Sequence, residues 1–144
     1  MSASHSMSGR CHCGAIHATL TTNLEAAEIP VRACQCGFCT RHGATTVSDP
    51  AGLLRFTINR AALSGYRFDT RTGTTLLCAR CGVYAGSVIE EAGKTWGILN
   101  ARGLAIPEFA GRDPTPVDYE GETAQARVAR RKANWTPAEI VYTS

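Results

Sequence analysis

The sequence predicts a mainly β fold in which antiparallel sheets surround cysteine-rich turns, with one short helix near the C-terminus. Residues 15–20 and 54–58 alternate apolar and polar side chains at the two-residue period of a half-buried strand. Residues 83–90 and 95–101 flank a turn at 91–94 (Glu-Ala-Gly-Lys) and indicate a hairpin. The third observation is that the seven cysteines fall in tight clusters along the chain.

The other elements follow in chain order. A turn at residues 49–52 (Asp-Pro-Ala-Gly) precedes the second strand. Pro107, Pro114, Pro116 and Gly111 predict an irregular surface loop over residues 107–118. Residues 122–133 contain good helix formers and predict the C-terminal helix.

One domain accounts for the chain, because 144 residues can bury a core without disulfides. We expect that domain to cover residues 9–144. Residues 1–8 are polar and lack the basic start and apolar stretch of a secretory signal, so we interpret them as a disordered leader. No apolar run approaches the roughly 20 residues of a membrane helix. These features predict a cytoplasmic protein without a membrane partner, and they allow a homo-oligomer.

The cysteines indicate metal binding. An odd number of them, in a chain without an export signal, argues against a disulfide framework. The clusters are Cys11 with Cys13; Cys34, Cys36 and Cys39; and Cys78 with Cys81. In each cluster a glycine directly follows one of the cysteines (Gly14, Gly37 and Gly82). Closely spaced thiolates can bind one ion, and glycine can adopt positive φ and let backbone N–H groups approach the sulfurs. The alternative, buried free cysteines, fits one or two residues better than seven.

Counting ligands divides the clusters into two sites. A closed structural zinc site takes four ligands, and the clusters supply two, three and two. Only the first and third clusters together reach four without a remainder. We therefore expect Cys11, Cys13, Cys78 and Cys81 to hold a structural Zn²⁺ that links the N-terminal segment to a distant turn.

The middle cluster then leaves three ligands for a second Zn²⁺. Three protein ligands with a vacant fourth position are typical of a catalytic or substrate-binding zinc site. A soft thiol would suit that position, since zinc lowers the pKa of a thiol that it binds. Two alternatives stay open: His42 fills the fourth position and makes the site structural, or Cys34, Cys36 and Cys39 bind no metal.

The order Cys-His-Cys-Gly, then Cys-x-Cys-x-x-Cys, then Cys-x-x-Cys-Gly resembles the glutathione-dependent formaldehyde-activating enzymes and the centromere protein V relatives, over roughly residues 9–110. The resemblance implies a β-tent fold, a structural zinc on the outer clusters and a catalytic zinc on the middle one. It also implies a carbon–sulfur lyase reaction, the reversible addition of the glutathione thiol to formaldehyde. The partners would then be a small thiol and a small aldehyde.

Two residues just beyond the middle cluster are candidates for further roles. Arg41 could bind a substrate carboxylate, and His42 could act as a general acid or base because histidine titrates near neutral pH. The predicted helix carries Arg127, Arg130, Arg131 and Lys132, which we interpret as a solvated face; the alternative is that they recognise a glutathione carboxylate or a partner. The rest of the chain is nearly balanced in charge, so we expect no nucleic-acid partner.

Two hypotheses about function follow. The first is a zinc-dependent enzyme that adds a thiol to an aldehyde beside the middle cluster. The second is a non-catalytic zinc-binding module that recruits a protein partner, with the middle cluster serving only the fold.

Overall fold

The computed structural model describes residues 4–143 and confirms the mainly β fold. The strands are β1 His5–Arg10, β2 Ile16–Thr22, β3 Arg32–Cys34, β4 Thr46–Val47, β5 Leu53–Asn59, β6 Leu63–Tyr66, β7 Thr74–Cys78, β8 Tyr84–Glu91, β9 Lys94–Asn100, β10 Thr115–Val117 and β11 Thr136–Thr143. The helices are α1 Gly37–His42 and α2 Ala124–Asn134, with 3-10 turns η1 Ala26–Glu28, η2 Arg60–Ala62 and η3 Pro107–Phe109.

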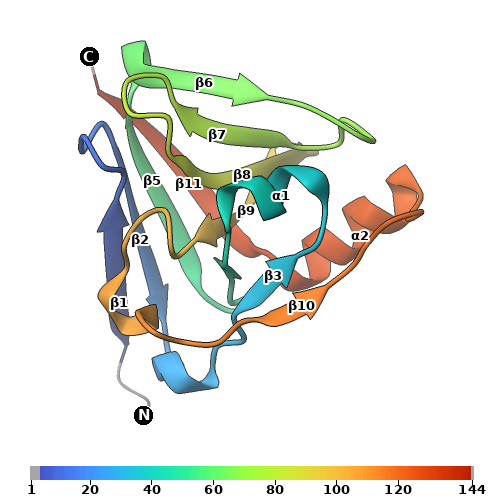
Figure 1. Cartoon of the computed structure of the whole chain (residues 1–144), viewed down its shortest axis with the longest axis horizontal. Helices are drawn as coiled ribbons and strands as arrows, with labels where there is room; N and C mark the ends of the chain where they lie inside the picture. The colour runs from blue at the N-terminus through green and yellow to red at the C-terminus, as the bar shows by residue number, and fades with distance from the viewer. Residues whose placement is uncertain (1–3, 144) are drawn as a thin grey trace.

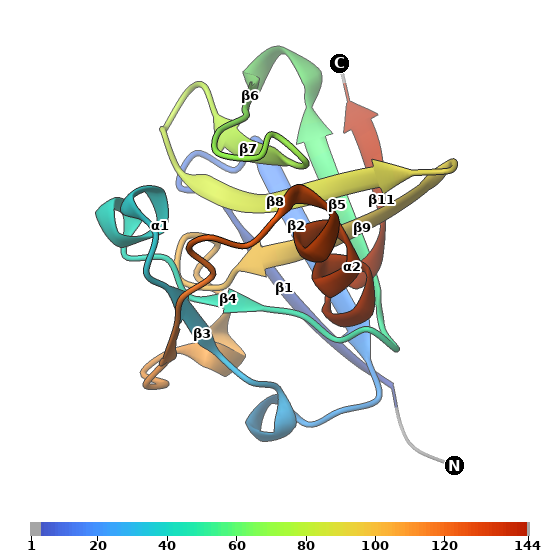
Figure 2. The same ribbon diagram turned by 90° about the vertical axis from the view of Figure 1, so that its right-hand side faces the viewer.

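The strands form one strongly bent sheet with the order β1-β2-β5-β11-β9-β4-β3-β10, and β8, β7 and β6 continue from β9 as a branch. β11 joins the two halves, because its first residues pair with β9 and residues 138–143 pair with β5. Figure 1 shows β1, β2 and β5 on one side of the molecule and β3, β10 and α2 on the other. Figure 2 shows α1 at the left of the view, beside the start of β8, and α2 nearer the centre, below β8.

The predicted strand pattern is confirmed at the core. Ile16, Ala18 and Leu20 of β2 are buried while their neighbours are less so, and β5 buries Leu54 and Phe56 in the same alternating way. The hairpin is also confirmed, since β8 pairs antiparallel with β9. Its turn places Ala92 at φ 53° and Gly93 at φ 78°, the left-handed conformations of a two-residue hairpin turn.

Two strand pairs are parallel, which differs from the expected all-antiparallel sheets. β11 runs parallel to β5, and β10 runs parallel to β3. Parallel neighbours need a long crossover connection, and in both cases the partners are separated by most of the domain in sequence. Long-range pairing of this kind has no local signature in the chain.

Residues 5–8, which we expected to be disordered, belong to β1 and correct that prediction; residues 1–3 lie outside the described part. β1 pairs with β2 from His5 opposite Thr22 onward, and Met7 points inward and is buried. A single apolar residue between serines was too weak a pattern to predict the strand. The predicted loop at 107–118 likewise contains η3 and β10.

The C-terminal helix is confirmed as α2, whose first and last residues differ from the expected bounds by one or two positions. It begins after Thr123, whose hydroxyl accepts a hydrogen bond from the N–H of Ala126 at 3.1 Å. Among the described residues, neither helix has both the length and the apolar character needed to cross a bilayer.

Candidate metal and substrate site

Four cysteines from two distant loops meet at one end of the sheet. Cys11 and Cys13 come from the connection between β1 and β2, whereas Cys78 ends β7 and Cys81 lies in the connection between β7 and β8. Their sulfur atoms all lie within 4.8 Å of one another. The structure therefore brings together the first and third clusters.

The spacing of these sulfurs fits a metal rather than a disulfide. Cys11 and Cys13 have their sulfurs 3.8 Å apart, and Cys13 and Cys78 have theirs 3.5 Å apart. Tetrahedral ligands at about 2.3 Å from zinc are about 3.8 Å from each other, whereas bonded sulfurs are about 2.05 Å apart. Backbone N–H groups of Ile16 and Cys81 donate to the sulfurs of Cys11 and Cys78 at 3.3 and 3.5 Å.

The glycines next to these cysteines make the turns possible. Gly14 has φ +85° and Gly82 has φ +80°, so both adopt the conformation that other residues rarely take. Gly37, after the middle cluster, does not follow this pattern, because it begins α1 instead.

The three sulfurs of Cys34, Cys36 and Cys39 form a second group within 4.8 Å. Cys34 ends β3, Cys36 precedes α1, and Cys39 lies within that helix. The sulfur of Cys36 accepts a hydrogen bond from the N–H of Cys39 at 3.3 Å, which fixes the turn that gathers the sulfurs. Such a set of three thiols fits one soft metal ion with a fourth position to spare.

Within the described chain, no histidine ligand atom belongs to either sulfur group. His42 packs its ring on Phe38, with 4.5 Å between ring centroids, and it is exposed. The geometry therefore does not favour His42 as the fourth ligand of the middle cluster.

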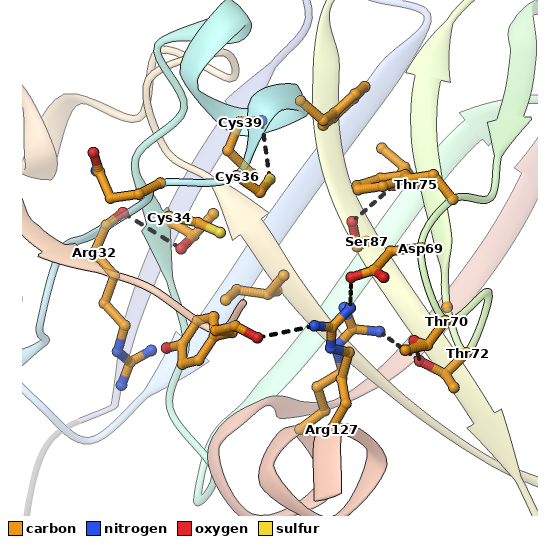
Figure 3. A pocket seen from close by; sticks show the side chains of 18 of the residues that line it. Arg32, Cys34, Cys36, Cys39, Asp69, Thr70, Thr72, Thr75, Ser87 and Arg127 are labelled. Atoms are coloured by element: carbon orange, nitrogen blue, oxygen red, sulfur yellow. Dashed lines mark hydrogen bonds and ion pairs between the residues drawn. The ribbon is translucent and has the colours of Figure 1, made fainter. Parts of the chain in front are cut away.

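The middle cluster opens into a cavity of 810 Å³. Figure 3 shows Cys34, Cys36 and Cys39 on one side of it and Arg127 with Asp69 on the other. Arg41 also lines the cavity, while its guanidinium donates to the carbonyl of Gly37 at 2.8 Å. His42 is not among the lining residues in the described part of the chain.

Aromatic side chains form the wall next to the cysteines. Phe38 lies 5.2 Å from Phe68 and 5.1 Å from Tyr84 between ring centroids, and Tyr66 stacks on Phe68 at 5.3 Å. All four rings line the cavity. This wall makes the surroundings of the cysteines largely apolar, which strengthens electrostatic interactions there.

A short chain of hydroxyl groups begins at Tyr84 of the aromatic wall. The hydroxyls of Tyr84 and Ser87 lie 3.3 Å apart, and Ser87 donates to Thr75 at 3.5 Å. Tyr84 is buried, and the burial raises the pKa of its hydroxyl well above the usual range. At neutral pH it is therefore a hydrogen-bond donor rather than an anion.

The middle cysteines share a proton unequally in the metal-free chain. A hydrogen bond from Cys39 lowers the pKa of the Cys34 thiol to about 5, against the opposing effect of partial burial. The same hydrogen bond, with burial, raises the pKa of Cys39. One thiolate at neutral pH gives the cluster a starting ligand for a cation.

The helix α2 supplies a basic wall, which corrects the interpretation of its arginines as a solvated face. Arg127 is buried, and its guanidinium pairs with Asp69 and with Glu122 at 3.0 Å. Arg130 and Arg131 line the same cavity. Arg127 and Arg131 are four residues apart, so the sequence indicates that they share one face of the helix. Nothing in the sequence indicates that this face lies against a cavity.

The comparisons with known proteins agree with the cysteine pattern. Residues 6–105 match the family model described as glutathione-dependent formaldehyde-activating enzyme. A crystal structure of a Rhodobacter sphaeroides protein is 28% identical in sequence, with a TM-score of 0.58, and covers 77% of this chain and 100% of its own. No curated protein matches the chain.

Proposed function

Because the chain belongs to the glutathione-dependent formaldehyde-activating enzyme family, we propose that it adds a glutathione-like thiol to formaldehyde or another small aldehyde. The reaction is that of a zinc-dependent carbon–sulfur lyase acting reversibly. The observation that carries the proposal is the group of three cysteine sulfurs opening into an 810 Å³ cavity. That cavity has room for a tripeptide-sized thiol together with a small carbonyl compound.

Two zinc ions per chain fit the donor sets. Cys11, Cys13, Cys78 and Cys81 provide four sulfurs for a closed structural site, and the middle cluster provides three for an open one. When bound at the open site, zinc supplies positive charge that lowers the pKa of a coordinated thiol.

The chemical step balances without a further reactant. The substrate sulfur forms a bond to the carbonyl carbon, the second carbon–oxygen bond of the carbonyl breaks, and the proton of the thiol ends on the new hydroxyl. We assign the hydrogen bond to the carbonyl oxygen to Tyr84, because this residue lines the cavity and its hydroxyl stays protonated. The hydroxyl would donate to the substrate in place of Ser87, its partner within the protein. His42 is less well placed, since its ring packs outside that lining.

Cobalt substitution tests the proposal directly. With Co²⁺ in place of zinc, glutathione is expected to change the visible absorption of the middle site, and Cys39→Ser is expected to abolish that change while the chain stays folded. Exchange NMR of formaldehyde with glutathione then measures whether the protein speeds the interconversion beyond its spontaneous rate. If no thiol changes the cobalt spectrum, the enzyme hypothesis is refuted.

The non-catalytic zinc module is the alternative outcome of the same experiment. A cluster that served only the fold would need no cavity with a polar and an apolar wall, and here the three cysteines line one. The module hypothesis therefore gains support only if the folded, metal-loaded chain shows neither thiol binding nor exchange.

A further inference from the structure

Three arginines of α2 line the cavity, but two of them already have carboxylate partners. Arg127 pairs with Asp69 and Glu122, and the guanidinium of Arg130 pairs with both oxygens of Glu122. Arg130 is further held over the ring of Tyr119, 3.5 Å from its centroid. These two charges are therefore satisfied within the protein.

Arg131 differs from its neighbours. Within residues 4–143, no ion pair joins it to a carboxylate. Its Nη1 donates to the hydroxyl of Thr72 at 3.2 Å, and its buried Nε has no hydrogen-bond partner in the described chain. The guanidinium lies over the ring of Trp135, 4.6 Å from its centroid. A cation is thus positioned at the cavity wall, and no carboxylate of the described chain pairs with it.

The position of Arg131 is fixed from both sides. Gly73 approaches it so closely that a Cβ there would lie 2.8 Å from Nη1. Thr72 and Gly73 belong to the loop before β7, so this loop and Trp135 together hold the guanidinium at the cavity. A guanidinium held in this way loses little conformational entropy when it binds a ligand.

The local electrostatics favours an anion at this position. Burial, together with the positive charges of Arg130 and Arg127, lowers the pKa of Arg131 to about 10. The group is still a cation at neutral pH, yet both burial and the two neighbours oppose its charge. A carboxylate beside it would relieve both effects.

We propose that Arg131 binds a carboxylate of the thiol substrate and so selects thiols that carry one. The assignment rests on the proposed function, because it needs the thiol end of the ligand at the middle cysteines. Cys34, Cys36, Cys39 and Arg131 line one cavity, so a ligand with a thiol at one end and a carboxylate at the other can contact both. A guanidinium and a carboxylate pair through parallel hydrogen bonds.

Other arginines at the cavity are less suited to this role. Arg41 is exposed and donates to the carbonyl of Gly37, and Arg32 donates to the hydroxyl of Ser48 at 3.3 Å. Arg131 also lies beyond residues 6–105, the part that matches the family model. Carboxylate selection is therefore a property that this chain adds to the matched region through α2.

The test compares glutathione with its diethyl ester, which has no free carboxylate. Cobalt-loaded full-length protein is titrated with each thiol, and the dissociation constants are read from the visible spectrum. The wild-type protein is expected to prefer glutathione by about 10- to 100-fold, the value of a charge-assisted hydrogen bond. Arg131→Gln is expected to remove that preference while leaving the affinity for the ester unchanged.

Lys132→Gln is the matched control, with the same charge change one residue along α2. Lys132 pairs with Glu91 at 2.9 Å and does not line the cavity, so this variant is expected to keep the wild-type preference. The assignment to Arg131 is overturned if Arg131→Gln keeps the preference, or if Lys132→Gln loses it equally.

Further outcomes distinguish a failure of this assignment from a folding defect and from a failure of the proposed function. Arg131→Gln removes a partly buried, uncompensated charge, so its melting temperature is expected to equal or exceed that of the wild type. If the Arg131→Gln protein does not fold, Arg131→Lys is used instead, because lysine keeps the charge but lacks the planar guanidinium. This variant is expected to prefer glutathione about 3- to 10-fold less than the wild type does. An unchanged preference refutes the assignment. Spectra that respond to neither thiol overturn the proposed function and this assignment together, whereas equal responses to both overturn the assignment alone.

Discussion

The sulfur atoms of Cys13 and Cys78 lie 3.5 Å apart although 65 positions separate them in the sequence. This contact connects the β1–β2 loop with the end of β7, and so it joins β1 and β2 to the branch of the sheet that contains β7. Without an ion, four clustered thiols offer little attraction to one another. We therefore expect the metal, rather than direct sulfur contacts, to hold these loops together.

Replacing Cys78 by serine is expected to unfold much of the chain. A structural zinc contributes on the order of 10 kcal/mol, comparable to the whole free energy of unfolding of a domain. Circular dichroism during thermal unfolding, with and without a chelator, measures the effect. Cys39→Ser, in the middle cluster, is the control and is expected to stay folded. A Cys78→Ser protein that melts like the wild type would refute the structural role.

The two-plus-two grouping of the outer cysteines followed from ligand counting, because a tetrahedral site has a fixed number of donors. The strands around Ile16 and Phe56 were predictable for a similar reason, since a half-buried strand imposes a period of two. The position of Arg131 was not predictable. Its helical face is visible in the sequence, but the cavity that this face meets is lined by residues from α1, β3, β7, β8 and the loop before β7, and no local pattern predicts that these segments come together.

Glu122 is expected to make the stability of the protein sensitive to acid. Hydrogen bonds from Arg130, and then from Arg127, lower the pKa of this carboxyl below its usual value, with burial acting in the opposite direction. A lowered folded-state pKa adds stability above the unfolded-state pKa, and that stability is lost as the pH falls through the folded-state value. The stability that Glu122 contributes is therefore lost at pH values below about 4.5.

Urea unfolding of wild type and Glu122→Gln from about pH 7 to about pH 3 measures this contribution. At neutral pH the substitution is expected to cost about 1–3 kcal/mol, and the two curves are expected to converge in acid. Glu139→Gln is the control, because its pair with Arg55 is exposed and worth under about 1 kcal/mol. Parallel curves for wild type and Glu122→Gln would contradict the prediction.

The zinc content of two variants distinguishes the possible ligands of the middle cluster. His42→Ala is expected to keep two zinc ions per chain, because the His42 ring packs on Phe38 rather than among the sulfurs. Cys39→Ser is expected to fall to one, because two remaining cysteines bind zinc weakly. Mass spectrometry under native conditions counts the ions. If His42→Ala also loses one zinc, the fourth ligand is the histidine and the open site does not exist.

Tyr84→Phe is expected to lower kcat about 100-fold while the zinc content and the KM for the thiol stay close to wild type. The side chain of Asn100 holds Tyr84 in place by donating to its carbonyl at 2.9 Å, and Phe38 meets its ring edge-on, so the phenylalanine ring fits the same position. Only the hydroxyl is lost, and with it the donor to the carbonyl oxygen of the aldehyde. Tyr142→Phe on the exposed part of β11 is the control. Exchange NMR reports both rates, and a Tyr84→Phe protein as fast as the control would remove Tyr84 from the mechanism and return the proton donor to His42 or to water.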